Sequence, residues 1–83
     1  VEVDTETGVV RVVRLTAVHD AGRIVNPTLA ESQLEGGIIQ GLGFALFEER
    51  RLDERMGLPL NVGLHDYKIP TLADIPEIDG HFL

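Results

Sequence analysis

The sequence predicts an α+β fold in which one long helix packs on an antiparallel sheet. Residues 26–49 carry a helix start signal followed by a helical distribution of apolar and small residues. The segments on both sides are rich in β-branched and turn-forming residues, which is typical of hairpins. Because the chain has 83 residues and 43% hydrophobic content, we expect residues 1–83 to form a single fragment of one domain.

The first predicted element is a hairpin over Val1–Val18. Residues 1–4 alternate apolar and acidic side chains, and Thr5–Gly8 has the composition of a turn. Residues 9–18 are dense in valine and predict one long strand with apolar groups on both faces. The loop after this strand contains Asp20 and Gly22, which favour a sharp turn.

The helix is predicted to begin at Asn26 and to end near Glu49 to Arg51. Asn26 is a good N-cap, and Pro27 suits the first helical position because its missing N–H has no partner to lose there. After the helix, residues 47–52 and 58–64 predict a second hairpin, with a turn around residues 53–57. Residues 78–83 predict a final strand.

The helix has one unusual face. With an advance of about 100° per residue, its four internal glycines fall within about 80° of Gln33, and Gln40 falls about 20° from it. The aliphatic residues lie on the other side. Each mid-helix glycine costs about 0.8–1 kcal/mol relative to alanine, so the four together cost about 3–4 kcal/mol. Some close approach to the bare backbone must offset this cost. The four glycines are Gly36, Gly37, Gly41 and Gly43.

Two explanations for this face remain open at this point. A second helix or a sheet could pack closely on the glycines. Alternatively, the two glutamines could bind a ligand, because an amide presents a donor and an acceptor together and matches the edge of a planar heterocycle.

Composition excludes several classes of function. The formal net charge of -7 leaves no basic patch for phosphates, so nucleic acid is not expected as a partner. The sequence contains no cysteine, which excludes thiolate metal sites and cysteine nucleophiles and is compatible with a cytoplasmic location. No apolar run is long enough for a membrane span.

No complete catalytic or metal-binding set is visible, so we predict no catalytic residue and no metal ligand in this chain. The three histidines have no zinc-ligand spacing, and the His19–Asp20 and His65–Asp66 pairs are more typical of structural loops than of general bases. Arg23 could bind a carboxylate or a phosphate, or it could be a solvated structural arginine.

The chain resembles the large, molybdenum-binding subunit of the xanthine dehydrogenase and aldehyde oxidase family. The resemblance covers essentially all 83 residues and is carried by an ordered set of motifs: Val18–Arg23 (VHDAGR), Asn26–Pro27, Gln33–Gly43 (QLEGGIIQGLG), Asp66–Pro70 (DYKIP) and Ile75–Glu77. The combination of Asp-x-Gly-Arg, Asn-Pro and Gln-x-x-Gly-Gly-x-x-Gln-Gly-x-Gly is fairly specific.

The resemblance implies a fragment of a molybdenum hydroxylase, an enzyme that hydroxylates an aldehyde, a purine or an N-heterocycle with oxygen from water. It implies a molybdopterin cofactor, in bacteria usually the cytosine dinucleotide form, contacted by Gln33. Gly36 and Gly37 would permit close approach, and Gln40 is the weaker candidate for a contact. It also implies that the partners are the remainder of the molybdenum subunit and iron–sulfur and FAD modules.

The family's catalytic glutamate lies in a Gly-x-Gly-Glu segment beyond residue 83. We therefore expect the isolated 83 residues to be inactive, to bind no cofactor alone and to self-associate. The alternative is a small non-catalytic interaction module whose glycine face docks a partner protein.

Overall fold

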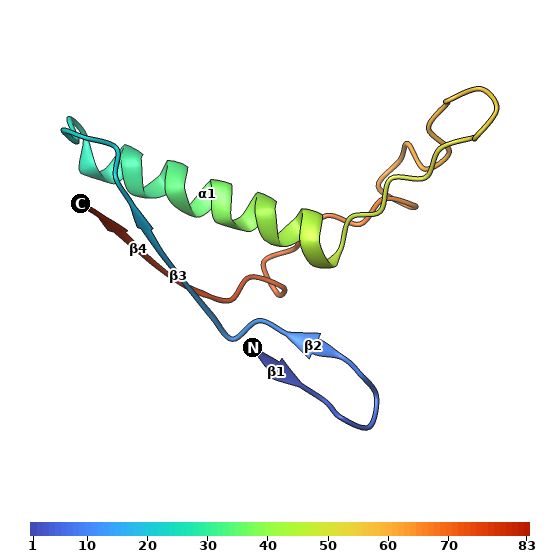
Figure 1. Ribbon diagram of the computed structural model, residues 1–83, viewed down its shortest axis with the longest axis horizontal. Coiled ribbons are helices and arrows are strands. Elements are labelled where there is room, and N and C mark those ends of the chain that lie inside the picture. Colours follow the sequence, from blue (N-terminus) through green and yellow to red (C-terminus); the bar gives the residue numbers. More distant parts are fainter.

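The computed structural model describes all residues 1–83, and it contains one helix and two small sheets (Figure 1). This arrangement confirms the predicted α+β class. No helix has the combined length and apolar character that crossing a membrane requires. In chain order, the elements are β1 (Glu2–Val3), β2 (Val10–Arg11), β3 (Arg14–His19), α1 (Pro27–Leu46) and β4 (Glu77–Phe82).

The first hairpin is present but shorter than predicted. Strands β1 and β2 pair antiparallel, with Glu2 opposite Arg11. Asp4 organises the turn, because its carboxylate accepts hydrogen bonds from the backbone N–H groups of Glu6 and Thr7 at 2.8 and 3.2 Å. These bonds, led by that from Glu6, lower the pKa of Asp4. The single long strand predicted for residues 9–18 was wrong, because the chain leaves the sheet at residues 12–13 and divides it into β2 and β3.

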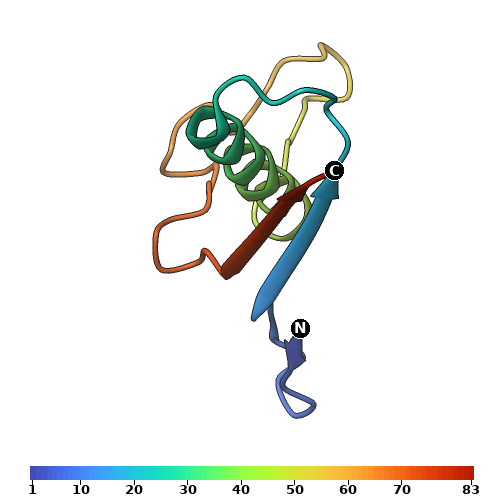
Figure 2. The ribbon, with the colours of Figure 1, turned by 90° about the vertical axis from the view of Figure 1, so that its left-hand side faces the viewer.

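The second sheet pairs β3 with β4, and the pairing is parallel, with Arg14 beside Glu77 and His19 beside Phe82. In Figure 2 the two arrows point the same way and α1 lies beside them. The predicted antiparallel sheet was therefore correct for β1–β2 and wrong for the sheet on which the helix packs. Parallel strands need a long crossover, and the chain between β3 and β4 includes α1.

The helix meets this sheet through a close contact at Gly80. A Cβ built on Gly80 would lie 2.8 Å from Cδ2 of Leu34, so a larger residue there would force the Leu34 side chain to shift. The wider core is small. Leu42 is the only buried hydrophobic residue, and Gly43 and Asn61 are the other two buried residues.

The start of α1 is as predicted, and its end comes earlier. Asn26 is the N-cap, and its side-chain oxygen accepts a hydrogen bond from the N–H of Leu29 at 3.1 Å. The helix ends at Leu46 because the N–H groups of Phe47 and Glu48 both donate to the carbonyl of Gly43, at 3.0 and 2.8 Å. Those carbonyl contacts turn the chain away from the helix axis before residue 49.

The second hairpin is reduced to one antiparallel bridge, between Leu52 and Pro59. The turn within it is confirmed, since the N–H of Gly57 donates to the carbonyl of Asp53 at 2.8 Å and Gly57 has φ +68°. The two strands predicted for residues 47–52 and 58–64 do not form. Two backbone bonds still join these segments, from the N–H of Asp53 to the carbonyl of Leu58 at 2.8 Å and from the N–H of Leu60 to the carbonyl of Arg51 at 2.9 Å. The side chain of Asn61 bonds the backbone of further loop residues.

Candidate functional site: the glycine face of α1

The four predicted contact residues lie on α1, and all of them are exposed. Gln33, Gly36, Gly37 and Gln40 share one side of the helix, which we call the glycine face. The structure brings them together through helical periodicity alone. Their role in binding stays a prediction.

Three of the four helical glycines face open space. A Cβ built on Gly36, Gly37 or Gly41 would meet nothing within 4 Å. Gly43 is different, because a Cβ there would collide with the side chain of Glu48 and lie 2.9 Å from Cδ of Pro70. The close-packing explanation therefore holds within this chain for Gly43 only. The bare backbone at the other three positions is available to a group from outside the chain.

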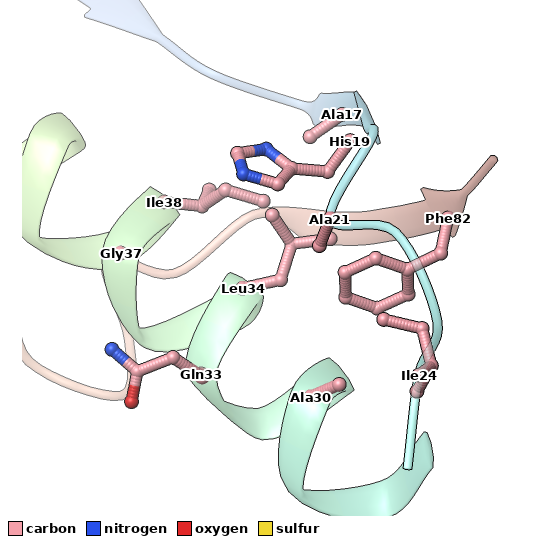
Figure 3. Close-up of a pocket in the computed structure, with 10 residues that line it drawn as sticks. All are labelled: Ala17, His19, Ala21, Ile24, Ala30, Gln33, Leu34, Gly37, Ile38 and Phe82. Carbon is pink, nitrogen blue, oxygen red and sulfur yellow. The ribbon is translucent and has the colours of Figure 1, made fainter. Parts of the chain in front are cut away.

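A hollow of about 590 Å³ lies on the sheet side of α1. Seven of its ten lining residues are hydrophobic, and they come from the carboxyl ends of β3 and β4, from the loop after β3 and from α1 between Ala30 and Ile38. Gln33 stands at its rim, but Figure 3 shows the Gln33 amide pointing away from Leu34 and Ile38. The amide is thus directed away from the hydrophobic lining, and Gly37 lies beside Gln33 at the same edge of the hollow.

The side chains of His19 and Asp20 make separate contacts. The carboxylate of Asp20 accepts a hydrogen bond from the N–H of Gly22 at 3.1 Å, which holds the loop that the sequence predicted. The ring of His19 lies edge-on to Phe82, with the ring centroids 6.4 Å apart. Both contacts hold the local structure at the end of β3.

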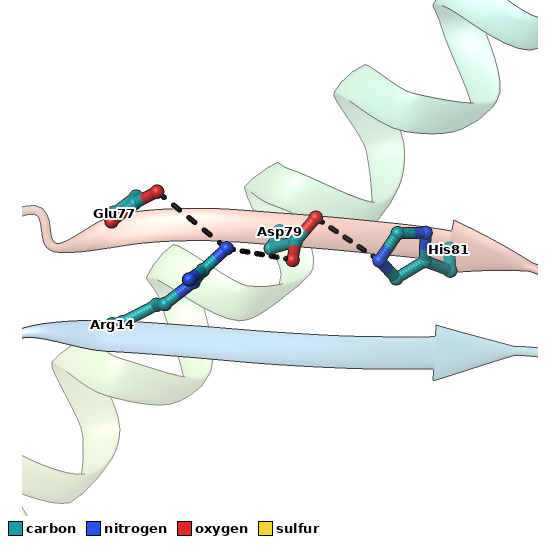
Figure 4. A network of polar contacts seen from close by, with 4 residues as sticks. All are labelled: Arg14, Glu77, Asp79 and His81. Carbon is teal, nitrogen blue, oxygen red and sulfur yellow. Dashed lines mark hydrogen bonds and ion pairs between the residues drawn. The ribbon is translucent and has the colours of Figure 1, made fainter.

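A polar network on the outer face of the β3–β4 sheet was missed from the sequence (Figure 4). Arg14 binds Asp79 at 3.0 Å and lies 3.7 Å from Glu77, and His81 lies 3.1 Å from Asp79. These residues meet only because the strands are parallel in this register. With side chains this exposed, each pair contributes at most about 1 kcal/mol.

Asn61 was also missed, and it holds the loop that follows α1. Its side-chain oxygen accepts from the N–H of Arg51 at 2.9 Å, and its amide nitrogen donates to the carbonyls of Glu49 and Asp66 at 2.5 and 3.4 Å. Nothing in the residues around Asn61 marks it in the sequence, because its partners are backbone groups.

A second contact ties this loop to the end of the helix. The hydroxyl of Tyr67 donates to the carboxylate of Glu48 at 2.5 Å, and this bond raises the pKa of Tyr67. The ammonium of Lys68 lies 4.4 Å from the centroid of the Phe47 ring, close enough for a cation–π contact.

The helix thus has a bare, outward-facing backbone and two exposed amides. Comparison with known families shows the family to which the chain belongs. Residues 1–76 match the molybdopterin cofactor-binding domain, and the chain belongs to this family. The family inferred from the sequence motifs is thereby confirmed.

Individual relatives give the same result. The chain is 47% identical to the xanthine dehydrogenase molybdenum-binding subunit of Escherichia coli O157:H7 over 70 residues. This aligned region makes up 84% of the chain and 9% of that subunit. It is 46% identical over 83 residues to the aldehyde oxidoreductase molybdenum-binding subunit PaoC of Escherichia coli K12, covering all of the chain and 11% of that subunit.

The crystal structure of quinoline 2-oxidoreductase from Pseudomonas putida 86 has a similar fold. It superposes with a TM-score of 0.87 and 40% sequence identity, covering 98% of this chain and 10% of that one. The chain thus spans about a tenth of the length of the relatives that it matches.

The exposed residues of α1 fit a cofactor of this kind. A planar heterocycle can approach the bare backbone at Gly36 and Gly37 without meeting a side chain of this chain. The amides of Gln33 and Gln40 lie on the same side and present both donors and acceptors. Gln33 and Gln40 would hold the edge of the ring system, and the glycines would admit it.

Proposed function

We propose that this chain is a segment of the molybdenum subunit of a hydroxylase, in which the glycine face binds and orients the molybdopterin cofactor. The observation that carries the proposal is the open space at Gly36, Gly37 and Gly41. These glycines cost the helix about 1 kcal/mol each, and nothing in the chain offsets that cost. A cofactor that packs on the bare backbone would offset it.

In this proposal, the cofactor supplies the redox chemistry that transfers oxygen from water to a carbon atom. The chain's own residues supply position. Gln33 and Gln40 hydrogen-bond the ring edge and fix its orientation, and the glycines set its distance from the helix. The substrate class is an aldehyde, a purine or an N-heterocycle, which is consistent with the names of the relatives.

Further parts of the proposal concern the intact enzyme. We assign it the cytosine dinucleotide form of the cofactor, iron–sulfur and FAD modules as electron-transfer partners, and a cytoplasmic location. Analysis of the nucleotide released from the purified subunit tests the first of these. The 83 residues alone should bind no cofactor and should self-associate through their exposed apolar side chains.

A free-standing interaction module is the less favoured function. Such a module would need a core of its own to fold, and Leu42 is the only buried hydrophobic residue of this chain. A segment embedded in a larger subunit has no such requirement.

The test is the molybdenum content of the longer subunit carrying single substitutions on the glycine face. Gln33→Ala should lower the molybdenum per purified subunit, because a lost hydrogen bond that leaves a buried partner unpaired costs about 1–3 kcal/mol. Gly37→Leu should abolish retention, because its side chain lies about 40° from Gln33 and would occupy the same space.

Ser32→Ala is a matched control, since Ser32 is exposed on the same helix and lies about 100° from Gln33. It should keep wild-type molybdenum content. Wild-type content and activity in both Gln33→Ala and Gly37→Leu would remove the glycine face from the cofactor site.

A further inference from the structure

The chain exposes far more surface than a compact protein of its size. Its accessible surface is 6844 Å² for 9.1 kDa, whereas a compact monomer of that mass exposes about 4,900 Å². Its radius of gyration is 16.4 Å, against about 12 Å expected for a compact chain of this length. The excess of about 2,000 Å² is well above the roughly 800 Å² that each partner buries in an interface of standard size.

Part of this excess lies where the fold itself requires cover. Parallel strands occur almost only in sheets that are covered on both faces. Leu34 covers β4 at Gly80, but towards the carboxyl ends of β3 and β4 the helix and the strands enclose the open hollow (Figure 3). Ala17, Phe82 and Ile38 line it and are only partly buried.

The lining of the hollow suits apolar side chains and does not suit a phosphate-bearing cofactor. No lysine, arginine, aspartate or glutamate lines it. Three alanines, Ala17, Ala21 and Ala30, leave room for side chains from elsewhere. The Gln33 amide, the polar group assigned to the cofactor, is directed away from it.

We infer that the hollow between α1 and the β3–β4 sheet is filled by apolar side chains from the remainder of the longer subunit. This inference rests on the proposed function for the existence of that subunit, and the length of the relatives, about ten times that of the chain, supports it. Gln33 and Gly37 of the glycine face stand at the edge of the hollow. This edge of α1 would then separate the protein packed against the strands from the cofactor on the rest of the glycine face.

Thiol labelling of the longer subunit tests this division, because the chain has no cysteine of its own. Ala21→Cys places a small reporter in the hollow, and Gln33→Cys places one on the glycine face. Both positions are exposed in the chain by itself. Each subunit is prepared both with and without molybdenum and treated with a maleimide, and labelling is located by peptide mass spectrometry. The urea-unfolded subunit gives the rate for full exposure.

We expect Ala21→Cys to label at least 100-fold more slowly than in the unfolded subunit, with or without molybdenum, and Gln33→Cys to label freely in the molybdenum-free subunit. Ala21→Cys labelling at the unfolded rate would overturn the inference, since the hollow would then be open to solvent. Protection only in the molybdenum-loaded subunit would also overturn it, because the cofactor would be the occupant. So would protection that appears only in a dimer detected by sedimentation, because a second copy would be the occupant.

A second variant covers the case in which the cysteine perturbs folding. Ala21→Asp should lower the thermal midpoint of the molybdenum-free subunit by at least 5 °C, because it would place a charge in a filled apolar site. An unchanged midpoint would contradict the inference. Failure of the proposed function has a separate signature, namely protection of Gln33→Cys in the molybdenum-free subunit or unchanged molybdenum content in Gln33→Ala.

Discussion

Replacing Asn61 should loosen the loop that follows α1. Asn61 is 6% exposed and holds three backbone groups through its amide. Asn61→Ala leaves the N–H of Arg51 and the carbonyl of Glu49 without these bonds, and it also removes the longer bond to Asp66. The two shorter bonds contribute about 0.5–1.5 kcal/mol each, so the loop should lose about 1–3 kcal/mol of local stability.

Hydrogen exchange measures this loss directly. Because 1.4 kcal/mol corresponds to a factor of ten, amide exchange at Arg51 should accelerate about 5- to 150-fold in Asn61→Ala. Val62→Ala is the matched control, since Val62 is the next residue and is 79% exposed. It should exchange as the wild type does. Equal exchange rates at Arg51 in Asn61→Ala and in the wild type would refute the idea that this amide holds the loop.

An aspartate at the same position adds a pH signature. The carboxylate of Asn61→Asp still accepts from the N–H of Arg51, but it faces the carbonyl of Glu49 without a proton to donate. Only the protonated form can donate to that carbonyl. Loop protection, measured relative to the intrinsic exchange rate at each pH, should therefore be greater when the new carboxyl is protonated and should fall as the pH rises through its titration. A protection factor at Arg51 that does not change with pH would contradict this reasoning.

Three further outcomes are expected. Gly36→Ala should stabilise the helix by up to about 1 kcal/mol, whereas Gly43→Ala should destabilise the chain because its Cβ would meet Pro70; thermal denaturation compares them, and equal midpoints would contradict the packing at Gly43. The N–H and hydroxyl of Thr71 lower the pKa of Asp74, so the turn they form should be stable above the ordinary aspartate pKa and weaken as the pH falls through the lowered value. A pH titration of exchange at Thr71 measures this, and the same profile in Asp74→Asn would exclude the carboxylate as its cause. The purified 83-residue chain should show no hydroxylase activity. Turnover of a purine or an aldehyde by this chain would refute the expectation that it is inactive by itself.

The local parts of the fold could be predicted from the sequence, because they depend on neighbouring residues. The Asn26 cap, the start of α1, and the turns with positive φ at Gly8, Gly22 and Gly57 all follow from side chains within a few positions. The parallel pairing of β3 with β4 could not be predicted in this way. Its register joins residues more than 60 positions apart, and no local pattern distinguishes a parallel partner from an antiparallel one.

The candidate site could also be predicted only as far as local sequence determines it. Helical periodicity alone places Gln33 and Gln40 on one side of α1, so the glycine face could be recognised before the structure was known. Periodicity treats the four helical glycines as equivalent, and they are not. Gly43 is close to Pro70, which lies 27 positions later in the chain, whereas Gly36 meets nothing in the chain. The close packing and the proposed cofactor contact thus use different glycines of one helix, and only tertiary contacts separate the two roles.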